Sequence, residues 1–231
     1  AKGHRAFGNR HLALGIPART APRPAPAHER RLEGGACLLR EAPAMVNGAG
    51  ETRKLLESLE LAAGNLDSFV TGNPKAPEVP DALLKLGTCQ QRMGALIVVP
   101  AERGPMLNGA KQTFEKILKG FPKEPQVAQA QMELAKCFAL EGNKGQAIND
   151  LKRFTQDPLQ NSPIAPFALA YLATLLREQN QAQQAADLLA AARQKHEPTL
   201  SKEPERIALL RYHHGVALQE AGKFPEARQV L

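Results

Sequence analysis

The sequence predicts an all-α protein built from stacked antiparallel helix hairpins, preceded by a tail without regular structure. Aromatic residues make up only 4% of the 231 residues and Trp is absent, whereas Ala and Leu are abundant. This composition suits closely packed helices better than a β-sheet. From about residue 51, helical segments alternate with Pro and Gly, and these segments resemble one another. Self-similarity at a regular spacing indicates a helical repeat protein.

Residues 1–50 differ from the rest of the chain. Prolines are scattered among Gly, Ala and Arg with no sustained helical or strand period, and Gly34-Gly35 argues against a short helix over Leu32 to Arg40. Such a segment cannot bury enough apolar area to offset the entropy of ordering it. We therefore expect a disordered basic tail over 1–50 and a helical repeat domain over 51–231.

The positive charge lies mainly in this tail. The whole chain carries a net charge of +7, and residues 1–50 hold eight Lys or Arg against three Glu, so the other 181 residues carry only +2. The tail has Phe7 as its only aromatic residue, so it lacks the stacking side chains of a nucleic-acid site. Nucleic acid is therefore not the expected partner.

A pair of residues, the first large and the second small, recurs in four expected first helices. The pairs are Leu86-Gly87, Leu134-Ala135, Leu172-Ala173 and His214-Gly215. A residue suited to a turn follows the large member after eight positions: Gly94, Gly142, Asn180 and Gly222. Each expected second helix then opens with a small residue: Ala110, Ala147, Ala185 and Ala227. A large apolar residue follows four positions later: Phe114, Leu151, Leu189 and Leu231. Small residues let two helices approach closely, and large ones fill the groove between them.

The repeat spacing is not uniform. Leu86 and Leu134 are 48 residues apart, which predicts an insertion over 95–105 in which Leu96 to Val99 prolong a first helix until Pro100 forces a turn. At the N-terminal side only a second helix is recognisable, around Ala62 and Leu66, so the first repeat is expected to be incomplete. At the other end the pattern stops in mid-helix, which favours a fragment with a partial last repeat.

The pattern is that of tetratricopeptide repeats, and the chain from about residue 51 is identified as a member of that superfamily. The segments 114–125, 134–138 and 142–148 further resemble repeats of bacterial cell-envelope proteins, of the Tol-Pal-associated cell-division coordinator and outer-membrane assembly lipoprotein type. The resemblance implies a right-handed superhelix that binds a protein or peptide on its concave face. It favours the periplasm or cell envelope, with the cytoplasm as the alternative.

The superfamily's groove positions, transferred by register, give thirteen candidate binding residues on four first helices. They are Leu84, Thr88, Gln91, Arg92, Gln129, Met132, Lys136, Phe167, Thr174, Arg177, Tyr212, Val216 and Gln219. Apolar anchors mixed with Arg and Lys are typical of peptide grooves. The alternative for Met132, Phe167 and Tyr212 is that they pack between hairpins, because core and groove positions adjoin in a solenoid.

No catalytic, cofactor or metal site is predicted. The sequence lacks phosphate-binding glycine loops, a nucleophile elbow and a His-Glu-x-x-His zinc motif. Cys37, Cys89 and Cys137 form no C-x-x-C pair, and the last two occupy equivalent repeat positions, where we expect core residues. His214 is expected in the core and His213 at the surface. No apolar run approaches the roughly 18 residues of a membrane helix.

Two functions remain open at this point. The first is a non-enzymatic scaffold or adaptor that binds a protein or peptide. The second is a regulatory helical-repeat domain of a larger enzyme, whose catalytic part lies outside this sequence.

Overall fold

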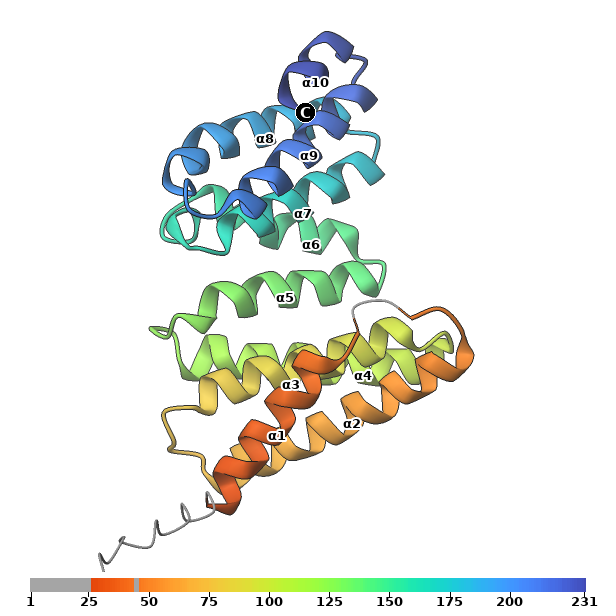
Figure 1. Cartoon of the computed structure of the whole chain (residues 1–231), viewed down its shortest axis with the longest axis vertical. Coiled ribbons are helices and arrows are strands. Elements are labelled where there is room, and N and C mark those ends of the chain that lie inside the picture. The colour runs from red at the N-terminus through yellow and green to blue at the C-terminus, as the bar shows by residue number, and fades with distance from the viewer. Residues whose placement is uncertain (1–25, 44–45) are drawn as a thin grey trace, which may run out of the picture.

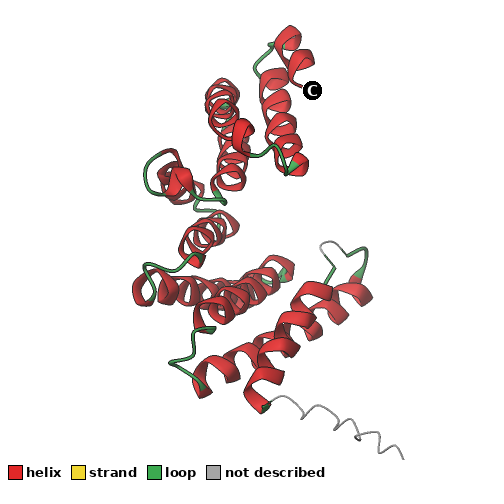
Figure 2. Cartoon of the chain, turned by 60° about the vertical axis from the view of Figure 1, so that its left-hand side comes forward, coloured by secondary structure: helices red, strands yellow, loops and turns green. Residues whose placement is uncertain are grey.

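The computed structural model describes residues 26–43 and 46–231, and this part of the chain contains ten α-helices and no strand. The helices form five consecutive hairpins that stack along one axis (Figures 1 and 2). The hairpins are α1 (Ala27–Glu41) with α2 (Ala49–Gly72), α3 (Val79–Leu96) with α4 (Pro100–Gly120), α5 (Gln126–Leu140) with α6 (Lys144–Lys152), α7 (Ala165–Glu178) with α8 (Ala182–His196), and α9 (Pro204–Glu220) with α10 (Phe224–Val230). Short 3₁₀ turns, η1 (Arg153–Thr155), η2 (Leu159–Asn161) and η3 (Glu197–Thr199), follow the second helices α6 and α8. The expected all-α superhelix is confirmed.

The turns inside the last three hairpins share one geometry. Gly142, Asn180 and Gly222 have φ of 87°, 60° and 77°, the left-handed region that Gly and Asn tolerate best. In each turn the amide one residue further on donates to a carbonyl five residues back, as Asn143 N does to Phe138 O at 2.9 Å. This is the Schellman arrangement that ends a helix. The expected turn residues are therefore confirmed at these three positions.

The small residues of the first helices allow close contact with the second helices. A Cβ on Gly87 would lie 2.5 Å from the Phe114 ring, and a Cβ on Gly215 would lie 2.5 Å from Leu231 Cγ. At Gly87 a larger residue would push α3 away from α4, because the Phe114 ring is fully buried. The expected pairing of a small residue with a large one across each hairpin is confirmed at both positions.

The N-terminal hairpin corrects one expectation. Residues 27–41 form α1, so the prediction that 1–50 lacks regular structure is wrong for this segment. A Cβ on Gly35 would lie 2.7 Å from Leu66 Cγ and 3.0 Å from Ala62 O. Gly35 thus packs against Leu66 across the hairpin, as Gly87 packs against Phe114. The helix α1 is therefore the first helix that seemed to be missing. Packing against α2 outweighs the helix penalty of about 1 kcal/mol for glycine. Residues 1–25, also expected to be disordered, lie outside the described residues.

The expected insertion is also corrected. The first helix α3 ends at Leu96, and Pro100 begins α4 rather than a projecting loop. Pro fits the first turn of a helix, where its missing N–H costs no hydrogen bond. Most of 95–105 therefore lengthens a second helix, and only the connection 97–99 projects, with Val98 88% exposed. Gly94 lies inside α3, where a Cβ would be 2.6 Å from Leu107 Cδ2, so it is a packing residue and not a turn residue.

The core consists of two apolar clusters that meet at α5. Ala130, Leu134 and Cys137 of α5 belong to the cluster of the first two hairpins, whereas Met132 and Ala135 belong to the cluster that continues to α10. Both clusters consist largely of Leu and Ala, as the composition predicted. Cys89 and Cys137 are fully buried, and this burial raises the pKa of Cys89 to about 12 and that of Cys137 to about 11. Their expected place in the core is confirmed.

Candidate functional site on the first helices

The thirteen candidate residues lie on α3, α5, α7 and α9, and we call the surface that these helices present the first-helix face. Three of the candidates are not accessible on it. Leu84, Gln91 and Met132 are buried at 8%, 7% and 5% exposure, respectively. Gln91 Nε2 donates to Glu133 O at 2.8 Å and lies 3.4 Å from Cys137 Sγ, so this amide joins α3 to α5. These three side chains hold the solenoid together and are removed from the candidate surface.

Arg92 is half-buried, and it hydrogen-bonds to the N-terminal hairpin. Its guanidinium donates to Leu39 O at 3.5 Å, to Ala42 O at 3.4 Å and to Pro43 O. The last carbonyls of a helix have no partner within the helix, so a cation at that end satisfies them and also interacts favourably with the helix dipole. Arg92 therefore fastens the C-terminal end of α1 to α3.

In the middle of the face, the ammonium group of Lys136 lies over the aromatic ring of Tyr171. Lys136 Nζ is 3.1 Å from Glu133 Oε1 and 5.9 Å from the centre of the Tyr171 ring, which joins α5 to α7. Thr88 and Gln129 are half-buried nearby on α3 and α5. Thr88 Oγ1 donates to Leu84 O at 2.8 Å, as Thr often does inside a helix. Thr88 and Lys136 are therefore already engaged within the protein.

The contact between α7 and α9 uses three more candidates. Arg206 lies over the Phe167 ring at 5.1 Å, and Thr174 Oγ1 is 3.5 Å from His213 Nδ1. Arg177 donates through two nitrogens to Glu220, with an Nε–Oε2 distance of 2.8 Å. These hydrogen bonds lower the pKa of Glu220 and raise that of Arg177, so both groups are charged at neutral pH. The charge of Arg177 is therefore balanced within the protein.

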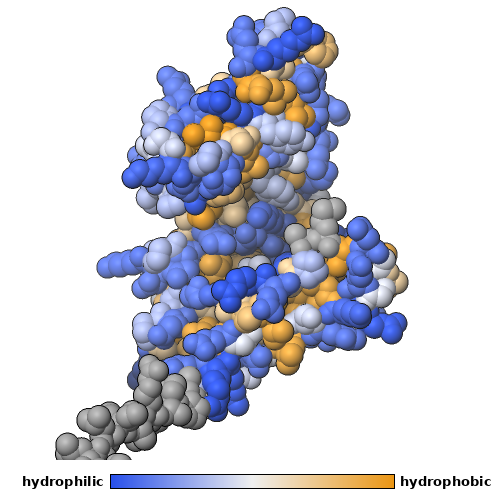
Figure 3. Space-filling view, viewed as in Figure 1, coloured by the Kyte–Doolittle hydropathy of each residue, from blue (hydrophilic) through white to orange (hydrophobic). Residues whose placement is uncertain are grey.

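The accessible apolar part of the face lies on α9. Tyr212 is 59% exposed and its ring meets the His213 ring edge-on, at 5.4 Å between centroids. Beside Tyr212 is a hollow of about 520 Å³, also lined by Pro204, Ile207, Ala208, Arg211 and Leu231. Val216 is half-exposed and Gln219 is exposed on the same helix. Figure 3 shows hydrophobic side chains at the surface of this end of the molecule, between hydrophilic ones. This region can accommodate an apolar side chain of a partner.

A polar network lies beside α9, between it and α8. Glu197 accepts from Arg193 Nε at 2.7 Å and from Arg211 Nε at 3.1 Å. Arg193 Nη1 lies 3.0 Å from His214 Nδ1, and because arginine only donates, Nδ1 must accept and the proton of the neutral ring is on Nε2. Burial lowers the pKa of His214 and the charge of Arg193 lowers it further. His214 is buried as expected, whereas His213 is half-buried between α7 and α9 rather than at the surface.

Four contributors to the first-helix face were missed by the sequence reasoning. They are Tyr171, Arg206, His213 and Glu220, which pair with candidates on the neighbouring helix. The register predicts which side of a helix a residue occupies, but not which residue of the next helix it meets. Within the described ranges, no group of three His, Cys, Asp or Glu side chains could hold a metal ion. No helix there has the length and hydropathy needed to span a membrane.

The five hairpins, their turns and their small-to-large pairs define a helical repeat protein with a tetratricopeptide-like unit. Residues 81–124, which include most of α3 and all of α4, match the tetratricopeptide repeat family model. Similar solved structures include a putative kinesin light chain with nearly identical TPR-like repeats from Podosopora anserina, which is 17% identical, with 90% of this chain and 93% of that chain covered and a TM-score of 0.55. A tetratricopeptide repeat protein from Parabacteroides merdae is also 17% identical, with 88% and 64% covered and a TM-score of 0.56.

At these identities the likeness shows the fold alone. The chain spans less than two thirds of the Parabacteroides merdae protein. No curated protein matches the chain in sequence.

Proposed function

We propose that the protein is an interaction scaffold that binds a protein or peptide on the concave side formed by its first helices, with the contact centred on α9. Repeats of this type generally serve as protein-interaction scaffolds, and stacked hairpins create extended surfaces suited to this role. The observation that carries the proposal is the exposed ring of Tyr212 beside a hollow of about 520 Å³. Exposed aromatic residues next to apolar hollows are frequent binding anchors.

The charges of the face favour a partner without high net charge. Arg177 is paired with Glu220, Lys136 with Glu133, and Arg211 with Glu197. A highly acidic partner would have to compete with these carboxylates for the same cations. A partner that presents an apolar side chain with neutral polar neighbours meets no such competition.

The test compares two exposed aromatic residues. Tyr212 of α9 is 59% exposed and Phe224 of α10 is 60% exposed, so replacing each with Ala removes a similarly accessible ring. Loss of an anchor ring costs about 1–3 kcal/mol, or roughly 5- to 150-fold in affinity. Proteins captured from a lysate of the source organism by wild type and Phe224→Ala should be lost with Tyr212→Ala. Equal capture by all three, with unchanged helicity, would show that the α9 surface is not the binding site.

We also propose a cell-envelope setting, on the resemblance of segments 114–125, 134–138 and 142–148 to envelope repeats. Fractionation of source cells with an antibody against the protein tests this. Recovery in the periplasmic or membrane fraction is expected, and recovery in the cytoplasmic fraction alone would contradict it.

A further inference from the structure

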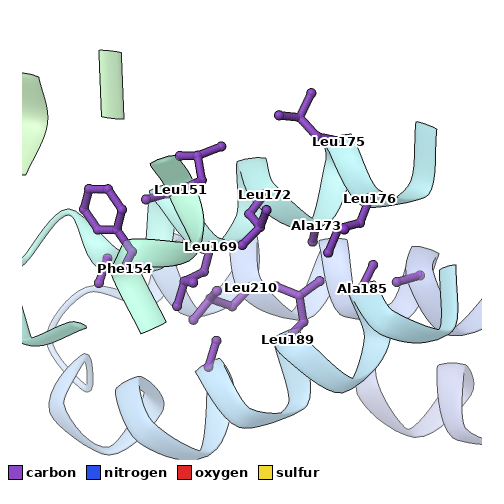
Figure 4. Packing of buried hydrophobic residues seen from close by; sticks show 14 of the residues in the cluster. Leu151, Phe154, Leu169, Leu172, Ala173, Leu175, Leu176, Ala185, Leu189 and Leu210 are labelled. Carbon is purple, nitrogen blue, oxygen red and sulfur yellow. The ribbon is translucent and has the colours of Figure 1, made fainter. Parts of the chain in front are cut away.

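Two neighbouring hollows lie along the second helices, and none of the thirteen candidate residues lines them. The larger, of about 390 Å³, lies between α6 and α8, and the smaller, of about 150 Å³, lies between η1 and the end of α8. Thr155 and Leu188 line both hollows, so the two adjoin, and we call them together the α6–α8 groove. Figure 4 shows Leu172 and Leu176, which line the larger hollow, along α7 within the buried cluster.

The groove is open because α6 ends early. The helix α6 has nine residues, whereas α8 has fifteen. Ala147 and Ala185 hold the same repeat position, so α6 ends at the level of Ala190 in α8. The rest of α8 lies beside η1, and the smaller hollow is lined there by Phe154 and Ala192. The short α6 thus leaves the outer side of α8 uncovered.

The described residues that line the groove include cations and no carboxylate. Lys152, Arg153 and Lys195 line it, and all three are exposed. Among the ion pairs formed by the described residues, none involves any of the three. Arg153 Nη1 donates to the neutral amide oxygen of Gln131 at 3.2 Å, which leaves the charge of the guanidinium unbalanced.

Acidic residues on the same elements do not line the groove. Asp150 of α6 accepts a hydrogen bond from Gln146, and Asp187 of α8 accepts one from Gln183. Asp157, which follows η1, is hydrogen-bonded within its own turn. Positive charge therefore surrounds the apolar walls of the groove without a carboxylate beside it.

We propose that the α6–α8 groove binds an acidic segment of a partner protein, in which an apolar residue is flanked by Asp or Glu. The apolar side chain lies against Leu188, which is half-buried and belongs to both hollows. The flanking carboxylates pair with Lys152, Arg153 and Lys195. From Gln184 to Lys195 the groove follows α8 for about 16 Å. An extended segment of about five residues spans this length.

A peptide fits this surface better than a nucleic acid does. Nucleic-acid sites without sequence preference use exposed rings on which bases stack. Phe154 is the only Phe, Tyr or Trp among the described residues that line the groove, and its ring is fully buried. A carboxylate next to an apolar side chain complements both the charge and the apolar walls.

The test offers the whole chain to an array of pentapeptides. In the first set, a central Leu, Met or Phe is flanked on each side by two Asp or Glu. In the second set Lys replaces the acidic residues, and in the third set Ser replaces the central residue. The first set should bind, and the second should not, because like charges repel. The third set should bind about three- to tenfold more weakly than the first, because it lacks the apolar side chain.

Two double variants of equal net charge locate the site. Lys152→Glu with Lys195→Glu reverses two charges of the groove and should weaken binding of the first set at least about fivefold. Lys54→Glu with Lys116→Glu reverses two lysines of α2 and α4 that line neither hollow, and should leave binding unchanged. All four lysines are exposed, so neither variant alters the core. The comparison is made at about 0.15 M salt, which screens charges more than about 8 Å apart.

The proposal is overturned if no peptide of the first set binds, if the first and second sets bind alike, or if the two double variants behave alike. Tighter binding of single-stranded DNA than of every peptide would also overturn it, since the groove is then a nucleic-acid surface. Tyr212→Ala should leave binding of the first set unchanged, so this proposal and the proposed site on α9 fail independently. Loss of binding in that variant would place the peptides on α9 and contradict the proposal.

Discussion

Replacing Gly35 with Ala tests whether α1 is a true first helix of the solenoid. A Cβ at this position would lie 2.7 Å from Leu66 Cγ and 3.0 Å from the backbone oxygen of Ala62. Leu66 is fully buried, so neither neighbour has free space to move into. The adjacent Gly34 is the matched control, because a Cβ there would meet only Asn65 Nδ2, at an ordinary 3.6 Å.

Both substitutions gain the same helix propensity, about 1 kcal/mol. Only Gly35→Ala also suffers overpacking, which typically costs about 1–3 kcal/mol. Gly34→Ala should therefore slow hydrogen exchange of the α1 amides. In Gly35→Ala the free energy of local opening, measured from the exchange of the same amides, should be about 1–3 kcal/mol lower than in that control. Equal protection in the two variants would show that α1 does not pack on α2 through Gly35.

Two further predictions concern pH and the contact between α7 and α9. Burial lowers the pKa of His196, His213 and His214, helped by the neighbouring cations, so the unfolded chain binds more protons below about pH 6.5 than the folded one. The thermal midpoint should therefore be highest above about pH 6.5 and should fall as the pH drops from there through the lowered pKa values of the folded protein. A midpoint unchanged between about pH 7.5 and 5 would contradict this. Replacing Arg177 and Glu220 with Ala, singly and together, should give a coupling energy of at most about 1 kcal/mol, because Glu220 is 43% exposed and solvent screens the pair. Coupling of several kcal/mol in urea unfolding would contradict that screening.

The repeat pattern was sufficient to predict the fold because each of its elements acts locally. A glycine or asparagine with positive φ at 142, 180 and 222 requires only its own turn. A small residue opposite a large one, as at Gly87 and Phe114, requires only one hairpin. The first helix of the N-terminal hairpin, α1, escaped detection because Gly34-Gly35 has poor helix propensity. Its decisive contact, with Leu66, involves a residue 31 positions away in the sequence.

The candidate site was less predictable, since exposure depends on the neighbouring repeat. Register alone placed Met132 and Tyr212 at the same position of two first helices, yet the first is 5% exposed and the second 59%. Met132 packs into the cluster that continues to α10. Arg177 was expected to face a partner, but its balancing carboxylate, Glu220, lies 43 residues further on and could not be identified from spacing.

Site-specific photo-crosslinking at Tyr212 tests the central proposal, binding on the α9 surface, most directly. Benzoylphenylalanine introduced at position 212 should form an adduct with the bound partner upon irradiation in source cells. The same group at Phe224, which is equally exposed on the second helix α10, should form none or far less. Adducts at position 224 and none at 212 would show that the partner binds the other side of the hairpin, and would contradict the account.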